Sequence, residues 1–582
     1  MGDVMADGKN AAAIESVGEM AGRFTSELMT FMGGWKQRLM AEPEELEQIE
    51  RDVHAAFARG ADLVVAGLIA VVMKQPEFEA AAERTRAGFA QPLTRGRKRT
   101  IGVQLLGGTL IWVASLYCAP RRGARSSEEK APGLYVELAQ FGCGKAITPG
   151  LESRVARQAA ICPSLELARR ELARDGVTLG VKTVRRITYQ CGEGLLRLRK
   201  HQLLLWREGK LPAGDELRGK RVSVQIDGGR TRLRSELRPA EQHREETDSD
   251  GLVTNDAPGR SKKRPAQTFD AEWREPKLVT IFVHDKRGRM IKEFSPTFEG
   301  TFLGPDAVAE LVAMHLHRLG AAHALSITFA ADGAPWIWDR IPRIVALAQL
   351  TNVPIHEVLD CCHAAHHISL ALAAFGLNET ERMPLYREHR TLLRNGQWRR
   401  VVEDLSDLVG DSENDKMRTE IAYLQKHGDA GRLSYPAFRK QGIPLGSGAI
   451  ESSIRRVINL RLKSNAIFWR EPNAESMLQV RAQVISNRWD QRVQEMRNLR
   501  RTNGLTDWTW RPQPMSIKTE AENKTALCPA KTRQKQRCRT EMHPMLFVFG
   551  DCETTKPEEI RGQVTIAGAA LVFIECYIQY PM

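Results

Sequence analysis

Alternating apolar and polar positions predict a series of strands in the middle of the chain, and helical spacing predicts the segments between them. Three runs predict strands: "RVSVQID", which ends in Asp227, and then "KLVTIFVHD" and "GRMIKEFSPTF", which a short Lys-Arg-Gly turn joins. A helix, "GPDAVAELVAMHLHRLG", precedes a strand, "ALSITFAAD", that ends in Asp332. A helix starting at "PWIWDRI" leads to the strand "PIHEVLD", which ends in Asp360. This order predicts an α/β layer around a mixed sheet.

Residues 1–75 have the pattern of helices, with Pro and Glu in the first turn of "EPEELEQIERDVHAAF". The stretch from Ile101 to Pro120 carries no charge, as a membrane span would. However, Gly107 and Gly108 lie at its centre between two β-rich runs, which predicts a β-hairpin. The C-terminal "VTIAGAALVFIECYI" is short for a span and has no basic flank.

Residues 145–192 have the pattern of three helices with a tight turn before the third, which is the layout of a helix-turn-helix. Ser164 is the expected N-cap of the second helix. The third helix carries Lys182, Arg185 and Arg186, which would meet phosphates or base edges. An ordinary three-helix unit with a solvated basic face explains the pattern equally well.

Residues 361–440 are rich in charge and have mostly the pattern of helices. After them, a glycine-punctuated loop leads into a helix in "IPLGSGAIESSIRRVINLRLK". Glu451 and Arg455 lie four residues apart on one face of this helix. The opposite face carries the apolar positions Ile450, Ile454, Val457 and Ile458.

The composition indicates the kind of binding partner and the cellular compartment. The chain has 582 residues, of which 42% are apolar, and this length suits two to four domains. Its formal net charge of +14 favours a polyanion such as nucleic acid as the partner. None of the ten cysteines forms a C-x-x-C pair, and no signal peptide is recognisable, which fits reduced thiols in a cytosol.

Asp227, Asp332 and Glu451 form a candidate acidic constellation. In a sheet of this order the first and fourth strands can be neighbours, and a helix on that face can add the third carboxylate. Three hard oxygen ligands suit two Mg²⁺ or Mn²⁺ ions, which together can cleave a phosphodiester. Gly228-Gly229 and Gly333 would let a DNA backbone approach closely. Any α/β protein has acids at strand ends, and a lone Asp-Gly is usually a turn.

A resemblance strengthens this interpretation. The motifs "VSVQIDGGRTR", "WREPKLVTIFV", "TFAADGAPWIWDRI", "LDCCHAAHHI" and "PLGSGAIESSIRRVINLRLK" stand in this order. Together they resemble the bacterial DDE insertion-sequence transposases of the ISKra family, over roughly residues 80–490. The resemblance implies an RNase H-like catalytic fold with Asp227, Asp332 and Glu451 as the catalytic and metal-binding triad. It also implies double-stranded DNA as partner, at the element's terminal inverted repeats and at the target, and a homodimer or higher oligomer in the nucleoid.

The pattern along the chain and the resemblance together divide it into a series of parts. They are a helical N-terminal region (1–75), a β-hairpin module at a degenerate zinc-ribbon position (76–144), a helix-turn-helix (145–200), the first part of an RNase H-like core (220–360), a helical insertion (361–445), the last part of the core with the Glu451 helix (446–510) and a tail of unknown role (515–582). Relatives commonly carry a cysteine pair after the hairpin, whereas Cys118 stands alone here. A DNA-binding protein that has lost catalysis, or a host nuclease of the same fold, therefore remains an alternative.

Further residues receive roles from the same motifs. Asp360 and His363 resemble an accessory D-x-x-H signature, although His363 can also be structural, or one of three zinc-spaced histidines with His366 and His367. Two tryptophans, Trp336 and Trp338, either pack the helix on the sheet or stack on an unpaired base. The remaining expected DNA contacts are Arg230, Arg455, Arg456, Arg461 and Lys463.

Overall fold

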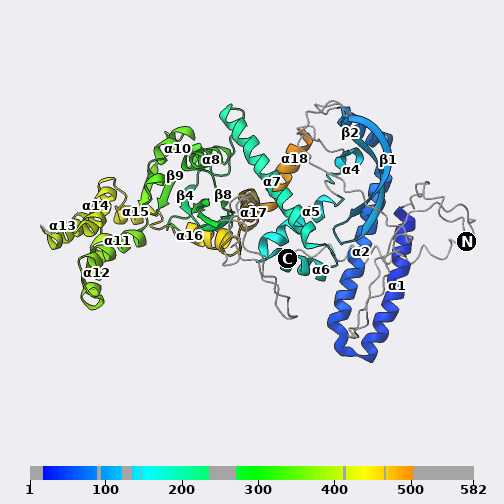
Figure 1. The fold of residues 1–582 in the computed structure, drawn as a ribbon, viewed down its shortest axis with the longest axis horizontal. Helices are drawn as coiled ribbons and strands as arrows, with labels where there is room; N and C mark the ends of the chain where they lie inside the picture. Colours follow the sequence, from blue (N-terminus) through cyan, green and yellow to red (C-terminus); the bar gives the residue numbers. More distant parts are fainter. Residues whose placement is uncertain are drawn as a thin grey trace, which may run out of the picture. The chain divides into compact units, whose positions relative to one another are not determined.

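The computed structural model of the chain describes residues 17–87, 93–120, 134–143, 146–234, 271–410, 414–463 and 467–502 (Figure 1). The chain forms two compact units. The first comprises residues 1–158, 166–184 and 497–582, and the second comprises residues 159–165 and 185–496. The predicted tail, 515–582, lies outside the described residues.

The first unit combines a helical hairpin with a small antiparallel sheet. Its first elements are α1 (Val17–Ala41), the 3₁₀ turn η1 (Pro43–Glu45), α2 (Leu46–Met73), α3 (Pro76–Ala87), β1 (Leu93–Gln104), β2 (Leu110–Pro120), β3 (Leu134–Tyr135) and α4 (Val136–Gln140). The predicted N-terminal helices and the β-hairpin are therefore confirmed. The buried carboxylate of Asp62 in α2 accepts hydrogen bonds from the backbone N–H groups of Gly107, at 2.9 Å, and Thr109, at 3.0 Å. A charge in α2 thus stabilises the hairpin turn.

One described helix is long and apolar enough to cross a membrane by length and composition, Pro43–Met73, and 39% of its most apolar window is buried. Core helices of soluble proteins meet the same criterion, so this finding is weak evidence for a membrane span. The uncharged stretch 101–120 forms strands, as predicted.

The three helices of the predicted helix-turn-helix are α5 (Pro149–Ile161), α6 (Leu165–Arg174) and α7 (Val181–Arg207). The third is much longer than the motif requires, with 27 residues, and it continues from the first unit into the second. The helices are confirmed as elements, whereas their arrangement as a helix-turn-helix stays a prediction.

A mixed five-stranded sheet forms the centre of the second unit, which confirms the α/β class. Its strands are β4 (Arg221–Gly228), β7 (Lys277–His284), β8 (Thr297–Thr301), β9 (Ser326–Ala331) and β10 (Ile355–Leu359), in the order β10-β9-β4-β7-β8. β4, β9 and β10 are parallel, whereas β7 and β8 are antiparallel to their neighbours. The first and fourth strands are neighbours, as predicted.

The predicted start of the third strand is wrong. Within 288–296 only Met290 pairs with a strand, in an isolated antiparallel bridge with His284, and β8 begins at Thr297, directly after Pro296. Proline has no N–H to donate to a neighbouring strand, so within sheets it is found mainly in edge strands or where a strand begins, and Pro296 directly precedes the edge strand β8.

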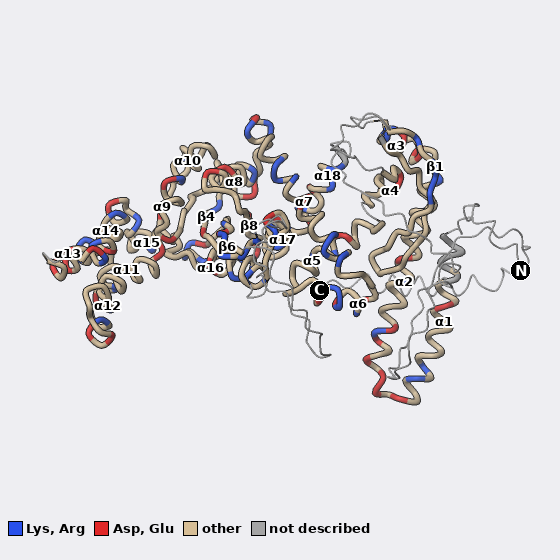
Figure 2. Tube along the Cα trace, viewed as in Figure 1, with Lys and Arg blue, Asp and Glu red and all other residues tan. Residues whose placement is uncertain are grey.

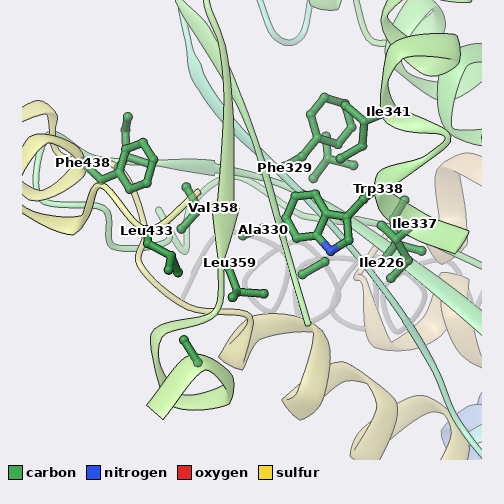
Figure 3. Packing of buried hydrophobic residues seen from close by; sticks show 14 of the residues in the cluster. Ile226, Phe329, Ala330, Ile337, Trp338, Ile341, Val358, Leu359, Leu433 and Phe438 are labelled. Atoms are coloured by element: carbon green, nitrogen blue, oxygen red, sulfur yellow. The ribbon is translucent and has the colours of Figure 1, made fainter. Parts of the chain in front are cut away.

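Helices cover both faces of the sheet. One face packs on α8 (Pro305–Arg318), α9 (Pro335–Trp338) and α10 (Ile341–Leu347), through a core that includes Val224, Phe329 and Trp338 (Figure 3). A 3₁₀ turn, η3 (Ala321–His323), follows α8. The other face packs on α16 (Gly448–Ile454) and α17 (Glu471–Ile485), through Leu278 and Leu478 among others.

The segment predicted to be mostly helical, residues 361–440, does form helices. It consists of α11 (Cys361–Ala374), α12 (Glu379–Arg394), α13 (Trp398–Val409), α14 (Asp415–Asp429) and α15 (Tyr435–Gln441). Both signs of charge lie along α12, α13 and α14 (Figure 2). After α16 follow a π-helical turn, η4 (Arg455–Asn459), then α17 and α18 (Trp489–Thr502). A separate two-stranded ribbon, β5 (Thr231–Arg234) with β6 (Ala271–Arg274), branches off between β4 and β7.

Candidate active site

The strand register brings Asp227 and Asp332 to the same edge of the sheet. β4 and β9 are parallel, with Gln225 opposite Ala330. Asp227 and Asp332 each follow this pair by two residues, so both lie at the carboxyl ends of adjacent strands. Side chains alternate between faces along a strand, so both carboxylates lie on the face that Gln225 occupies.

Gln225 fixes Glu451 over this face. Its Nε2 donates to the carbonyl oxygen of Gly446, at 3.0 Å, and its Oε1 accepts from the backbone N–H of Ile450, at 2.9 Å. Ile450 is fully buried, whereas the next residue, Glu451, is exposed at the start of α16. Glu451 is thereby held on the same face of the sheet as Asp227.

The pKa of Asp227 is raised by burial and, to a lesser extent, by the other two acids. Burial is the largest cause that raises this pKa, from 3.8 to about 6, and the carboxylates of Asp332 and Glu451 raise it further. A hydrogen bond from the backbone N–H of Gly228, at 2.6 Å, and the nearby His363 act in the opposite direction. Like charges close together disfavour the ionised form, and a bound cation would relieve that repulsion.

His363 contacts the third acid of this set. Its Nε2 lies 3.3 Å from Oε1 of Glu451, and both side chains are partly exposed, by 40% and 54%. The hydroxyl of Ser447 lies 3.4 Å from the same oxygen. This position is compatible with the predicted accessory role of His363.

Asp360 has a structural role at the start of α11. Its Oδ1 accepts from the backbone N–H groups of Cys362, at 2.6 Å, and His363, at 3.0 Å, and it caps α11. Its Oδ2 accepts from the hydroxyl of Ser447, at 2.8 Å, and from the backbone N–H of that residue. The side chain is buried and both oxygens are engaged, so Asp360 ties α11 to the loop before α16. The structure shows this structural role for Asp360, and its predicted accessory role stays a prediction.

The glycines of the acidic motifs accommodate the protein's own side chains. A Cβ atom at Gly228 would overlap the carboxylate of Glu275, and one at Gly229 would lie 2.8 Å from Ile458. A Cβ atom at Gly333 would overlap the ring of Tyr423. The space on the Cβ side of these glycines is therefore filled by the protein's own side chains, and close approach of a DNA backbone to them stays a prediction.

Tyr423 is a site residue that the sequence interpretation missed. It comes from α14 and stacks on His367, with ring centroids 3.6 Å apart, while His367 also contacts Glu420. Its hydroxyl is buried and has no hydrogen-bond partner among the described residues. Burial and the carboxylates of Asp332 and Asp360 raise the pKa of Tyr423 above its ordinary value. No local sequence motif identifies Tyr423 as a site residue, because only the folded helices α11–α15 bring it to the sheet.

The two tryptophans after Asp332 differ in environment. Trp338 is 3% exposed and its Nε1 donates to the carbonyl oxygen of Asp332, at 2.8 Å, so packing is its role. Trp336 is half-buried, and Nζ of Lys277 lies 5.5 Å from the centre of its ring. Trp336 therefore packs partly against the protein and also lies beside the cation of Lys277, at the edge of the sheet that carries Asp227 and Asp332.

Most of the expected DNA contacts are accessible. Lys182, Arg185, Arg230, Arg455, Arg456 and Lys463 are exposed, whereas Arg186 is half-buried. Lys and Arg recur along α7 (Figure 2). Arg461 is only 4% exposed, its guanidinium lies 5.3 Å from the ring centre of Trp469, and burial lowers its pKa. The prediction that Arg461 contacts phosphate is wrong, because its charge lies inside the protein.

The donor set determines which ion could bind here. Carboxylate oxygens are the ligands that Mg²⁺ and Mn²⁺ prefer, and the raised pKa of Asp227 has burial as its first cause and the neighbouring carboxylates as lesser ones. Among the described residues, no group of three or more His, Cys, Asp and Glu side chains has the spacing of a metal site. Comparisons of the chain with protein-family models, curated proteins and solved structures give no match.

Proposed function

We propose that this chain is a DNA transposase, which binds the ends of an insertion sequence and catalyses phosphodiester hydrolysis and strand transfer. The observation that carries the proposal is the position of Asp227 and Asp332 at adjacent strand ends, on the face where Gln225 holds Glu451. The mixed sheet with two adjacent acidic strands is compatible with an RNase H-like core. The motif resemblance supplies the reaction class.

Asp227, Asp332 and Glu451 would hold two Mg²⁺ or Mn²⁺ ions. When bound, such ions activate water and stabilise the charge on the leaving oxygen. The protein contributes position: Gln225 fixes the loop and helix that carry Glu451, and Asp360 anchors the same loop to α11. His363 orients Glu451 and could exchange a proton with a reacting oxygen.

Double-stranded DNA is the proposed partner, both at the terminal inverted repeats and at the target. Exposed basic residues on α7 and beside Glu451 support this choice, because phosphate neutralisation dominates affinity for DNA. We further propose a homodimer or higher oligomer on DNA and a cytoplasmic, nucleoid-associated location.

A second candidate is a transposase-derived DNA-binding protein without catalysis. One observation favours it: Cys118, at the position where relatives commonly carry a cysteine pair, is a free, buried thiol. This candidate predicts DNA binding without cleavage.

The deciding experiment is a nicking assay on a supercoiled plasmid that carries the DNA flanking the coding sequence. Wild type and Asp332→Asn are compared in Mg²⁺ and in EDTA, and binding to the same DNA is measured in parallel. Nicking that requires both Mg²⁺ and Asp332 supports the transposase. Binding without nicking by the wild type favours the second candidate. If the wild type neither binds nor nicks the DNA, both candidates are contradicted.

A further inference from the structure

The β5–β6 ribbon begins four residues after Asp227, at Thr231, and it is anchored to the rest of the second unit. The hydroxyl of Thr231 donates to the carbonyl oxygen of Leu462, at 2.9 Å. The backbone N–H of Arg234 donates to the carbonyl oxygen of Trp469, at 2.9 Å. The backbone N–H of Trp469 donates to the carbonyl oxygen of Arg232, at 3.0 Å. These bonds make the ribbon a fixed extension of the chain that carries Asp227.

One face of the ribbon packs inward and the other faces solvent. Leu233 is buried in the core, whereas Arg232 and Arg234 alternate with it and lie on the opposite face. Arg232 is paired directly across the ribbon with Trp273, and side chains paired in this way share a face. The outer face therefore combines two arginines with a tryptophan.

Trp273 is exposed to an unusual degree for its size, at 50%. The guanidinium of Arg232 lies 4.7 Å from the centre of its ring and 5.9 Å from that of Phe468. The structure contains a second pair of a cation and an indole at the acidic edge, Lys277 with Trp336. Lys277 is paired with Gly228, the residue after Asp227. Cations interleaved with aromatic rings are the composition of surfaces that bind single-stranded nucleic acid.

We propose that the outer face of the β5–β6 ribbon, formed by Arg232, Arg234 and Trp273, binds an unpaired segment of the DNA strand beside the carboxylates. The phosphates contact the arginines, and one unpaired base stacks on Trp273. The inference rests on the proposed function for the identity of the ligand as DNA. It adds that the substrate is recognised through a locally unpaired nucleotide.

The chemistry of the face distinguishes this ligand from others. In a duplex each base is stacked between its neighbours, so an indole on the protein surface reaches a base face only where the nucleotide is unpaired or terminal. An acidic peptide would pair with the arginines but would gain no stacking partner from the indole. Stacking on a tryptophan is tolerant of sequence, since every base has an aromatic face.

The test measures binding to two labelled DNAs of the same sequence, a blunt duplex and a duplex with an unpaired overhang, by fluorescence anisotropy. Wild type, Trp273→Ala, Trp273→Phe and a control, Leu325→Ala, are compared. Leu325 is as exposed as Trp273, at 52%, and directly precedes β9, so it lies at the end of that strand opposite to Asp332. Thermal melts establish that each variant is folded.

The wild type is expected to bind the overhang more tightly than the blunt duplex. Trp273→Ala should lose about tenfold in affinity for the overhang, a typical value for one base–aromatic stack, and much less for the blunt duplex, which offers the indole only its terminal base pairs. Trp273→Phe should retain part of the preference, and Leu325→Ala all of it. Arg232→Gln should reduce the salt dependence of overhang binding by about 0.7 in slope, as expected for one phosphate contact to a single strand.

Two outcomes would overturn the inference: equal binding of both DNAs by the wild type, or an equal loss on both DNAs in Trp273→Ala. These outcomes are separable from failure of the proposed function. Overhang preference without Mg²⁺-dependent nicking would leave the strand-binding face intact and contradict catalysis. Nicking without overhang preference would support catalysis and contradict the strand-binding face.

Discussion

The side-chain oxygen of Gln225 accepts a hydrogen bond from the backbone N–H of Ile450, 225 residues further along the chain. The same side chain donates to Gly446, so one amide holds the loop and the helix start on either side of Ser447. Glu451 depends on this link for its position, because α16 is only seven residues long and has no side-chain cap of its own.

Replacement of Gln225 by leucine should therefore separate positioning from binding. The variant keeps similar volume but loses both hydrogen bonds of the amide, to Gly446 and to Ile450, whose N–H keeps the carbonyl oxygen of Ser447 as an acceptor at 2.9 Å. Two lost hydrogen bonds cost about 1–3 kcal/mol of unfolding free energy. DNA cleavage should fall while DNA binding stays close to wild type. Ser223→Ala is the matched control: it lies on the same face of β4, and its buried hydroxyl has no partner among the described residues. Equal effects of the two substitutions would contradict the positioning role.

The raised pKa of Asp227 predicts a pH dependence of stability. Because its folded-state pKa is about 6, above the ordinary 3.8, its contribution to stability is fully present below about pH 4 and is lost as pH rises through 6. Asp227→Asn should therefore stabilise the metal-free protein at pH 7 by about 1–3 kcal/mol, and much less at pH 4. Denaturant titrations in EDTA at the two pH values measure this difference.

A control of opposite sign is Asp285, whose pKa is lowered to about 2, chiefly by the backbone N–H of Arg289. Its stabilising contribution is present above the ordinary pKa and is lost as pH falls towards 2. Asp285→Asn should consequently lower stability at pH 7. If both asparagine variants shift stability in the same direction, the assigned cause at Asp227 is wrong.

Removal of one carboxylate should change the response to metal. Asp332→Asn keeps the shape of the side chain and loses its charge, so Mg²⁺ should raise the melting temperature of wild type more than that of the variant. In EDTA the variant should melt at the same temperature as wild type or higher, because one of three repelling carboxylates is gone. An identical Mg²⁺-induced rise in both proteins would mean that Asp332 binds no ion.

Gly333→Ala tests whether this glycine serves packing or substrate approach. The added methyl group would overlap the ring of Tyr423, which is held by its stack on His367. We expect a loss of about 1–3 kcal/mol in unfolding free energy without any DNA present. Tyr423→Ala combined with Gly333→Ala should lose less than the sum of the single changes. Unchanged stability with weakened DNA binding would support the interpretation of Gly333 as space for DNA.

The basic residues at the start of α7 can be tested by salt dependence. Lys182→Ala and Arg185→Ala, both at exposed positions, should each reduce the slope of log affinity for duplex DNA against log salt by about 0.9. Lys200→Ala, an exposed lysine further along the same helix, is the control and should leave the slope unchanged. Unchanged slopes in all three variants would exclude this part of α7 from DNA binding.

Local patterns determined which elements form. Alternation and glycine placement predicted the hairpin around Gly107-Gly108, and the same alternation placed Asp227 and Asp332 at the ends of strands. Helical spacing predicted that Ile450 and Ile454 face the core while Glu451 faces outwards. These features follow from the order of apolar and polar residues over a few positions, so they are readable without a tertiary structure.

The tertiary structure alone decided which distant groups meet. The carboxylate of Asp360 is engaged by Ser447, 87 residues away, and the ring of Tyr423 fills the space beside Gly333. Arg461 is buried and Trp273 is exposed, although arginine is ordinarily exposed and tryptophan is ordinarily buried. No local period encodes these outcomes, because each depends on the packing of segments that are far apart in the chain.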